Sequence, residues 1–335
     1  MPHPGSRIRG IFHYRYYLPS AFSTLLFMRI MRTQSLRTFY LGNQLDTRCL
    51  TGIAGLYKRQ VPRSTEIFGK SPIPELHCTV LWEAEYSIIR KEVMSLYSEF
   101  AQWYEQLFPF REEVYLFLCE HVGTSGSSIL DAGCGPGHYC ARFQRDGFRS
   151  TGIDLDSKMI DEAVTSFPDS EFFCMSIEDV ASLHRSFRLI YSTGNVVAHL
   201  SPARFSAFLQ DAYTALEPGG CWIFQVVNWD YILGLAEYRF PVKTVDDGSV
   251  AFYRRYPVIS QERVIFDVEL VSGGQKVFNE QTTLYPLTAD NFLQRHRDVG
   301  FSLTGMYAGF DKTPFNRDRD SGLVMVFMKE RGSSV

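Results

Sequence analysis

The sequence of 335 residues contains seven cysteines but no C-x-x-C pair. The cysteines are scattered, and their number is odd. Structural zinc sites and disulfide frameworks both rely on regularly spaced cysteines, so we expect neither, and we assign no metal. This usage is typical of a protein kept in a reducing compartment, and it predicts a cytoplasmic location.

A long, uninterrupted apolar run is also missing. The best candidate, Tyr17 to Ile30, is short and is broken by Pro19 and Arg29. A helix that crosses a membrane needs about 20 consecutive apolar residues, so we expect no membrane span. The run also lacks a convincing small-residue cleavage site, which argues against a signal peptide.

Acidic residues are absent from the first 45 positions, which contain six arginines. Residues 1–93 carry 13 basic and six acidic side chains, a net charge of +7. The remainder has a net charge of −10, which together with the first part gives the −3 of the whole chain. A nucleic-acid binder needs a basic face for phosphates, so we expect no nucleic-acid partner for this larger, acidic part.

The change in composition predicts an N-terminal extension, residues 1–93, followed by the main domain, residues 94–335. Three interpretations of the extension stay open. The first is an organelle-targeting segment, because the extension is rich in arginine and poor in acid. The second is a poorly ordered extension. The third is translated upstream sequence that is not part of the native protein. We favour the last, because Met94 opens a tyrosine-rich, helix-like segment directly ahead of the regular pattern.

The most informative segment is Ile129–His138, ILDAGCGPGH, which is followed by Gly152–Asp156, GIDLD. Small and apolar residues ahead of Asp131 predict a buried parallel strand. The glycines allow a sharp turn and the close approach of a ligand, and the next helix would point its N-terminal N–H groups at that ligand. Asp154 then ends the neighbouring strand, where a carboxylate can reach ribose hydroxyls.

The spacing of the glycines distinguishes among nucleotide-binding folds. A dinucleotide fingerprint reads G-x-G-x-x-G, whereas this loop reads G-x-G-x-G with Asp131 two residues ahead. The pattern resembles motif I of the class I S-adenosylmethionine (SAM)-dependent methyltransferases, D-x-G-x-G-x-G. The resemblance covers about residues 94–330 and implies SAM as the cofactor. Two alternatives stay open: a nicotinamide-dependent oxidoreductase, and a non-catalytic SAM-binding or scaffold protein on the same fold.

Apolar strands alternate with helical segments through most of the main domain. The predicted strands lie at about 127–131, 149–154, 171–175, 187–192 and 221–227, and the predicted helices at about 95–107, 111–121, 138–146, 202–216 and 290–299. A further helix opens at Asp156, a plausible N-cap. Two closing strands, near 302–308 and 322–329, resemble the family's terminal hairpin. The order predicts an α/β fold with a doubly wound, Rossmann-like, seven-stranded methyltransferase sheet.

The rhythm changes after the fifth strand. Three β-rich runs, Val250–Tyr256, Arg263–Val271 and Lys276–Leu287, follow one another without helices, and Gly273-Gly274 marks a hairpin turn. They predict an antiparallel β insertion, about residues 230–287, on the substrate side. Arg254 in this insertion is a candidate to hold a carboxylate of the acceptor, and a solvated strand face is the alternative.

The resemblance also assigns residues around the cofactor. Asp131 would meet the ammonium of the methionine portion, the loop N–H groups its carboxylate, and Asp154 the ribose. Ser176 stands where many relatives have an acid, which leaves adenine recognition to a backbone contact or to Glu178. The expected cofactor-binding residues are Tyr97, Tyr104, Asp131, Gly133, Cys134, Gly135, Gly137, Asp154, Leu155, Met175, Ser176, Ile177 and Gly194.

On the acceptor side, Ser192–Leu200, STGNVVAHL, resembles the G-N-x-x-x-H-L segment of glycine- and sarcosine-type small-molecule N-methyltransferases. It implies a small-molecule acceptor, methylated at nitrogen, near Asn195 and His199. Asn228 and Trp229 would border that acceptor; for them a structural turn is the alternative. Methyl transfer requires alignment and exclusion of water, so a general base is needed only if the acceptor arrives protonated. His199 is the best candidate for that base, and its alternative is a locally satisfied helix-start histidine.

Overall fold

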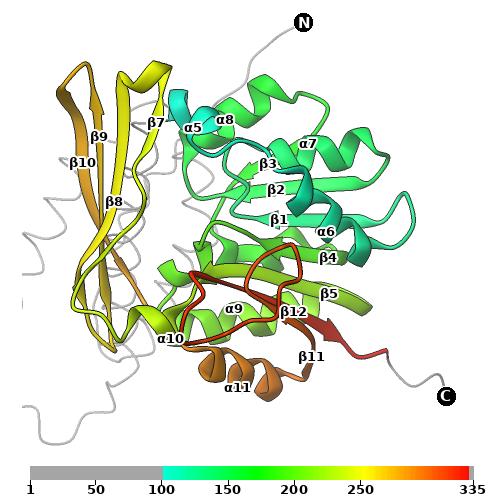
Figure 1. Cartoon of the computed structure of the whole chain (residues 1–335). Coiled ribbons are helices and arrows are strands. Elements are labelled where there is room, and N and C mark those ends of the chain that lie inside the picture. Colours follow the sequence, from blue (N-terminus) through cyan, green and yellow to red (C-terminus); the bar gives the residue numbers. More distant parts are fainter. Residues whose placement is uncertain (1–100, 332–335) are drawn as a thin grey trace, which may run out of the picture. The chain divides into compact units, whose positions relative to one another are not determined.

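Figure 1 shows the computed structural model, which describes residues 101–331. The extension 1–93, its boundary at Met94, and Tyr97 lie outside the described residues. The division into domains therefore stays a prediction. The first described helix, α5 (Ala101–Leu107), ends where the predicted helix over 95–107 ends.

A seven-stranded sheet forms the centre of the described chain (Figure 1). Its strands are β1 (Ser128–Ala132), β2 (Arg149–Asp154), β3 (Glu171–Cys174), β4 (Phe187–Ser192), β5 (Leu216–Val227), β11 (Phe301–Tyr307) and β12 (Gly322–Lys329). They lie in the order β11-β12-β5-β4-β1-β2-β3, and β12 is antiparallel to both of its neighbours. The order reverses between β1 and β4, and ligands of such sheets bind at this point, outside the carboxyl ends of the strands. The predicted doubly wound, Rossmann-like sheet is confirmed.

Helices cover both faces of this sheet. They are α6 (Glu112–Val122), α7 (His138–Arg145), α8 (Ser157–Ser166), α9 (Pro202–Ala215) and α11 (Ala289–Val299). Successive residues of a strand point to opposite faces. Accordingly, Ile129 packs in one apolar cluster with Phe143 of α7, whereas Leu130 packs in another with Phe205 of α9. α8 begins at the predicted cap, because the Asp156 carboxylate accepts hydrogen bonds from two N–H groups of its first turn.

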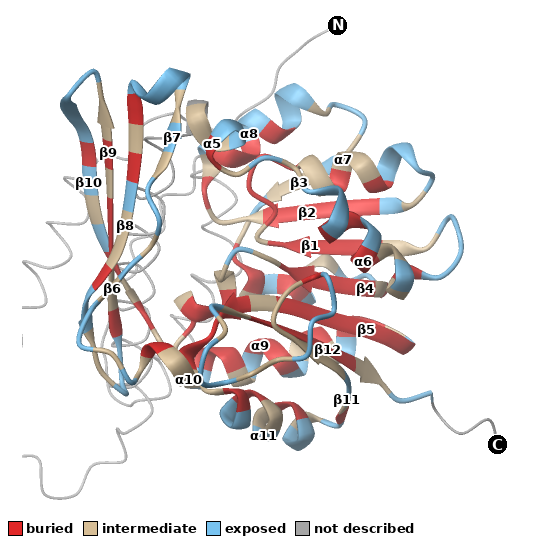
Figure 2. Ribbon diagram, in the orientation of Figure 1, coloured by how far each residue is buried: buried red, intermediate tan, exposed pale blue. Residues whose placement is uncertain are grey.

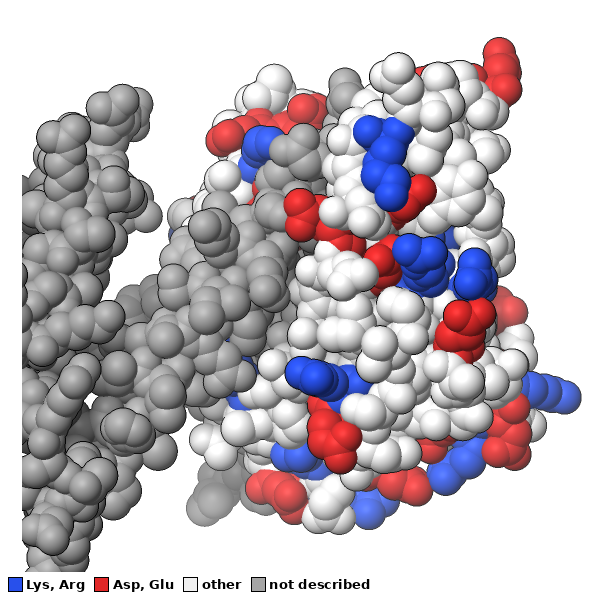
Figure 3. All heavy atoms as spheres, turned by 90° about the vertical axis from the view of Figure 1, so that its left-hand side faces the viewer, with Lys and Arg blue, Asp and Glu red and all other residues white. Residues whose placement is uncertain are grey.

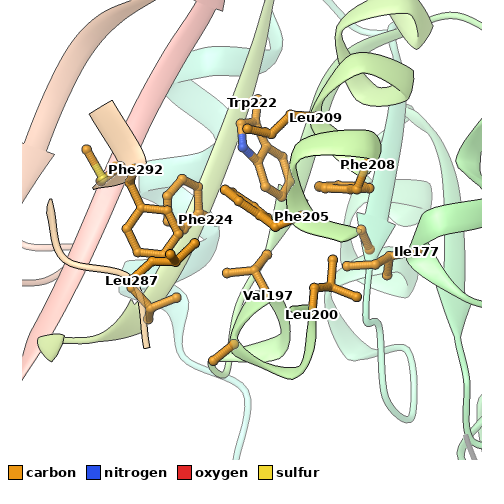
Figure 4. Packing of buried hydrophobic residues seen from close by; sticks show 14 of the residues in the cluster. Ile177, Val197, Leu200, Phe205, Phe208, Leu209, Trp222, Phe224, Leu287 and Phe292 are labelled. Carbon is orange, nitrogen blue, oxygen red and sulfur yellow. The ribbon is translucent and has the colours of Figure 1, made fainter. Parts of the chain in front are cut away.

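The apolar cluster between the sheet and α9 and α11 is rich in aromatic side chains (Figure 4). Phe205 lies edge-on to Phe224 of β5 and to Phe292 of α11, with ring centroids 6.3 and 5.4 Å apart. Burial of each such ring contributes about 1.5–3 kcal/mol to folding. Figure 2 shows the result: the central strands are almost entirely buried, while exposed residues lie on the outer faces of the helices, in loops and on the antiparallel strands.

A second, five-stranded sheet is antiparallel throughout and occupies the predicted insertion. Its strands are β6 (Tyr238–Arg239), β7 (Lys243–Val245), β8 (Val250–Ile259), β9 (Val264–Ser272) and β10 (Gln275–Leu284), in the order β10-β9-β8-β6 with β7 also paired to β8. Gly273 and Gly274 have φ angles of 57° and 76°, and they form the predicted turn between β9 and β10. Tyr256, Val264 and Leu284 belong to the apolar cluster of the main sheet, so the insertion is packed onto the domain that carries it.

Some local predictions were wrong or incomplete. The helix predicted over 202–216 ends at Ala215, close to its predicted end, but the strand predicted at 221–227 begins earlier, because Leu216 already pairs with Phe187. The short elements η1 (Ile177–Leu183), η2 (Val196–His199), α10 (Trp229–Ile232) and η3 (Asp246–Gly248) were not predicted. Between residues 101 and 331, no helix is both long enough and apolar enough to cross a membrane.

Candidate active site

The glycine loop joins β1 to α7 and adopts backbone conformations that side chains rarely permit. Gly133, Gly135 and Gly137 have φ angles of 97°, 52° and 85°. A Cβ atom on Gly133 would lie 2.6 Å from a methyl group of Val196, and one on Gly137 would lie 2.5 Å from the ring of Phe172. Glycine is therefore required by the backbone conformation and by the neighbours of the loop.

Asp131, in β1, places one carboxylate oxygen where no protein donor reaches it. The side chain is 2% exposed, and its Oδ2 accepts hydrogen bonds from the Tyr191 hydroxyl at 2.8 Å and the Cys140 thiol at 3.8 Å. Its buried Oδ1 has no hydrogen-bond partner among the described residues. Burial raises the pKa of Asp131 to about 7; the Tyr191 hydrogen bond opposes this change, and the neighbouring Asp154 adds to it. A cationic ligand group at Oδ1 would supply the missing partner.

Asp154 ends β2 and is tied to the glycine loop. Its Oδ2 accepts a hydrogen bond from the Gly135 N–H at 2.9 Å, and its Oδ1 accepts one from the Asp156 N–H at 2.9 Å. Burial raises the pKa of Asp154 to about 6, although these two hydrogen bonds partly offset it. Because a carboxylate has about four lone-pair positions, both oxygens can still accept from a ligand.

A cavity of about 340 Å³ lies against these carboxylates and the glycine loop. Its walls come from the carboxyl ends of β1, β2 and β4, from the loop between α5 and α6, and from β7 of the antiparallel sheet. The predicted residues that line it are Tyr104, Asp131, Gly133, Cys134, Gly135, Asp154, Leu155, Ser176, Ile177, Gly194 and His199. Eleven residues far apart in the sequence thus meet in one place.

Comparison with known proteins decides the class of ligand. The family model described as "Methyltransferase domain" matches residues 129–220. A malonyl-[acyl-carrier protein] O-methyltransferase of Enterobacter lignolyticus is 26% identical over 205 residues, 61% of this chain and 76% of that protein. A ubiquinone biosynthesis O-methyltransferase of Psychrobacter cryohalolentis is 21% identical over 192 residues, 54% of this chain and 72% of that protein.

Solved structures agree on the fold. An S-adenosylmethionine-dependent methyltransferase from Clostridium acetobutylicum superimposes with a TM-score of 0.59 at 16% identity, covering 70% of this chain and 99% of that one. The CcbJ methyltransferase from Streptomyces caelestis gives a TM-score of 0.58 at 15% identity, covering 69% and 96%. Residues 129–220 thus match a methyltransferase domain, and the chain has the fold of the class I SAM-dependent methyltransferases. It is therefore an enzyme whose cofactor is SAM.

The methyltransferase site fits SAM at the positions where the cofactor carries charge and hydroxyl groups. The unpartnered Oδ1 of Asp131 suits the ammonium of the methionine portion. The glycine N–H groups suit its carboxylate, and Asp154 at the tip of β2 suits the ribose. Tyr104 lies over the loop, with its hydroxyl 3.6 Å from the position that a Cβ on Gly135 would occupy.

The adenine end differs from one sequence expectation. Ser176 lines the cavity and caps η1 by accepting a hydrogen bond from the Glu178 N–H. Glu178 is not a lining residue; its carboxylate is held by the guanidinium of Arg204, with Nε–Oε1 at 2.7 Å. Glu178 is thus engaged in an ion pair outside the cavity. Met175 also stays outside the cavity and packs against the main apolar cluster.

Of the two residues expected near the transferred methyl group, His199 and Asn195, only His199 lies at the cavity. His199 lines the cavity, and burial lowers its pKa to about 4, with a smaller effect from the positive charge of Arg204. Asn195 does not line the cavity. It has a φ of 69°, and its Oδ1 accepts a hydrogen bond at 3.1 Å from the N–H of Val227 at the end of β5. The expectation that Asn195 faces the methyl group is therefore not met, because the amide is used to hold the backbone.

The residues expected at the acceptor also serve the scaffold. Asn228 is fully buried, and its Nδ2 donates hydrogen bonds to the carbonyl oxygens of Arg317 and Asp320 at 2.9 and 2.8 Å. Trp229 is 1% exposed and stacks on Tyr256, with ring centroids 5.6 Å apart. Neither lines the cavity, so the structure places both in the turn that was the alternative. Gly137 opens α7 behind the loop and does not line the cavity either.

Several lining residues were missed from the sequence. They are Phe108, Phe110, Arg111, Tyr139, Thr193, Gln225, Lys243 and Phe310, among others. They lie in the loop before α6, at the ends of β4 and β5, on the two-turn helix α7, in the three-residue strand β7 and in the connection between β11 and β12. The pattern of these segments predicts at most a helix or a strand, and only the tertiary fold brings these side chains together. Arg254, which was predicted, stays behind this wall, with its guanidinium 4.8 Å from the ring centroid of Phe240.

Proposed function

We propose that the enzyme moves the methyl group of SAM to a nitrogen atom of a small-molecule acceptor by in-line displacement. The observation that carries the proposal is that one cavity is lined both by the SAM-binding carboxylates and, on its other walls, by His199, Gln225 and Lys243. Its volume of about 340 Å³ lies at the lower end of the range typical of small-molecule sites, about 300–1,000 Å³.

The residues of this site would act mainly by position. When bound, SAM supplies a methyl group on a sulfonium, already activated for displacement. Asp131 and Asp154 would fix the methionine portion and the ribose of the cofactor, while the aromatic side chains of Phe108, Phe110 and Phe310 line the cavity and exclude water. Alignment and exclusion of water together can supply several kcal/mol of the rate acceleration.

The state of His199 favours nitrogen over oxygen. With a pKa near 4, its imidazole is neutral at pH 7 and is a weak base. A hydroxyl acceptor has to lose its proton during transfer, whereas an amine that binds uncharged offers a lone pair directly. We propose that His199 orients the acceptor by a hydrogen bond and does not remove its proton. The O-methyltransferases among the relatives make oxygen the second candidate.

The test is a transfer assay on the full chain with SAM labelled in its methyl group. The acceptors are small amines and hydroxyl analogues of matched size, and mass spectrometry locates the label. We expect label on nitrogen, and loss of turnover but retained SAM binding in His199→Phe. Label found on hydroxyl products alone would replace nitrogen by oxygen, and no label in either set would contradict a small-molecule acceptor.

A further inference from the structure

Three basic side chains from different elements come together on one side of the cavity. Arg111 directly precedes α6, Lys243 opens β7, and Arg254 lies in the middle of β8. Arg111 and Lys243 line the cavity, whereas Arg254 lies behind it. The guanidinium of Arg254 and the ammonium of Lys243 share the ring of Phe108, at 5.5 and 4.1 Å from its centroid.

Lys243 is the half-buried member of this group. Its Nζ donates a hydrogen bond to the carbonyl oxygen of Leu107, and no carboxylate lies within ion-pair distance of it in the described part of the chain. Burial, together with smaller effects from the positive charges of Arg254 and Arg111, lowers the pKa of Lys243 to about 8. The ammonium therefore bears both a desolvation cost and repulsion from its neighbours.

Basic residues elsewhere on the antiparallel sheet are paired with acids. Lys276 lies 2.7 Å from Glu269, and Arg255 lies 3.0 Å from Asp267. Figure 3 views the molecule from the side of this sheet, and basic and acidic side chains are interspersed over the visible surface. Of the two cations of this group that line the cavity, Arg111 lies 3.0 Å from Glu113, whereas Lys243 has no carboxylate at ion-pair distance among the described residues.

We propose that Lys243 and Arg111 bind an anionic group of the methyl acceptor, a carboxylate or a phosphate, inside the cavity. This proposal rests on the proposed function, because it describes the acceptor of the same site. The acids that line the cavity, Asp131 and Asp154, are assigned to the ammonium and ribose of SAM, so they leave the charge of Lys243 uncompensated. An anion beside Lys243 would restore a charge-assisted partner and relieve the repulsion. Arg254 would add to the positive potential without touching the ligand.

The test uses the full chain saturated with S-adenosylhomocysteine, which occupies the glycine loop. Inorganic phosphate and acetate are titrated separately and followed by NMR, on the wild type and on Lys243→Met. The matched control is Lys276→Met, which removes a lysine from the same sheet outside the cavity. Lys243→Arg restores the charge.

We expect the wild type and Lys276→Met to bind at least one of the two anions alike, Lys243→Met to bind it at least tenfold more weakly, and Lys243→Arg to recover most of the affinity. Tighter binding of phosphate identifies a phosphate-bearing acceptor, and tighter binding of acetate a carboxylate. Equal affinity in wild type and Lys243→Met, or no binding of either anion to the wild type, would overturn the proposal. Anion binding is measured without turnover. A negative result in this titration can therefore be distinguished from a negative result in the transfer assay.

Discussion

At the scale of single residues, the site is defined by groups whose charge the fold has altered. Burial raises the pKa of Asp131 to about 7, so a large share of its carboxyl groups is protonated at pH 7. Its Oδ1 has no hydrogen-bond partner among the described residues and can bind a ligand. An ammonium placed at that oxygen favours the ionised carboxylate, so binding of the cofactor has to release a proton wherever Asp131 is protonated beforehand. SAM is therefore expected to bind more weakly as the pH is lowered.

We predict that the affinity for SAM falls as the pH is lowered from 8 to 5.5, by up to about tenfold per pH unit below pH 7. Protonation of Asp154, with a pKa of about 6, adds to the loss at the lower end. Calorimetric titrations across this range measure the effect. In Asp131→Asn the affinity should be lower at pH 8 and the slope near pH 7 should disappear. An affinity of the wild type that does not change with pH contradicts the role given to Asp131.

A buried histidine controls stability in the same pH range. His296 in α11 accepts a hydrogen bond from the Trp222 indole at 3.1 Å and donates one to the Phe292 carbonyl at 2.6 Å, so it is neutral in the folded state. Burial lowers its pKa to about 3, whereas an unfolded chain would titrate near 6.5. The unfolded state therefore binds the proton first, and the contribution of His296 is complete above pH 6.5 and lost as the pH falls toward 3.

We predict that the free energy of unfolding of the wild type, relative to that of His296→Gln, decreases by about 1 kcal/mol or more between pH 7 and pH 5. Denaturant unfolding of both proteins at the two pH values measures it. The comparison with the variant is needed because Asp131 and Asp154, whose pKa values are raised, shift stability in the opposite direction over this range. A difference that stays constant with pH would show that His296 is not held neutral.

At the scale of elements, predictions succeeded where a local pattern fixes the structure. β2 and β4 have the bounds read from the sequence, because a run of apolar residues between turn signals specifies a buried strand. β7 and α10, of three and four residues, are too short for any periodicity. The same limit applies to Asn195 and Asn228. Their amides bind backbone groups of distant segments, and that use of the side chain has no signature in the sequence.

The antiparallel sheet was predicted as an element, but its part in the site was misplaced. The sequence pointed to Arg254, because it is a cation in the first of the β-rich runs that follow the fifth strand. The structure places Lys243 of β7 in the cavity wall and Arg254 one layer behind it. β7 pairs with β8, and the Lys243 ammonium donates a hydrogen bond to the carbonyl oxygen of Leu107 in α5, an arrangement that has no signature in the sequence.

At the scale of the whole molecule, the cavity described above is formed by residues within 101–331, whereas the extension before Met94 remains a prediction. The apolar clusters of this part are built from side chains of the two sheets and of the helices packed on them. We predict that a shortened chain beginning at Met94 folds, binds SAM with unchanged affinity, and melts within a few degrees of the full chain. Thermal unfolding and calorimetry of both chains measure this. Loss of folding or of SAM binding would show that residues 1–93 are an integral part of the protein.

The central claim is that the glycine loop and Asp154 form a SAM site, and calorimetric titration of the full chain with SAM and with NAD tests it most directly. We predict saturable binding of SAM, no comparable binding of NAD, and an affinity for SAM that is weaker by about 1–3 kcal/mol in Asp154→Ala, because hydrogen bonds to a charged acceptor are lost. Preferential binding of NAD, or an affinity for SAM that is unchanged in Asp154→Ala, would contradict the account.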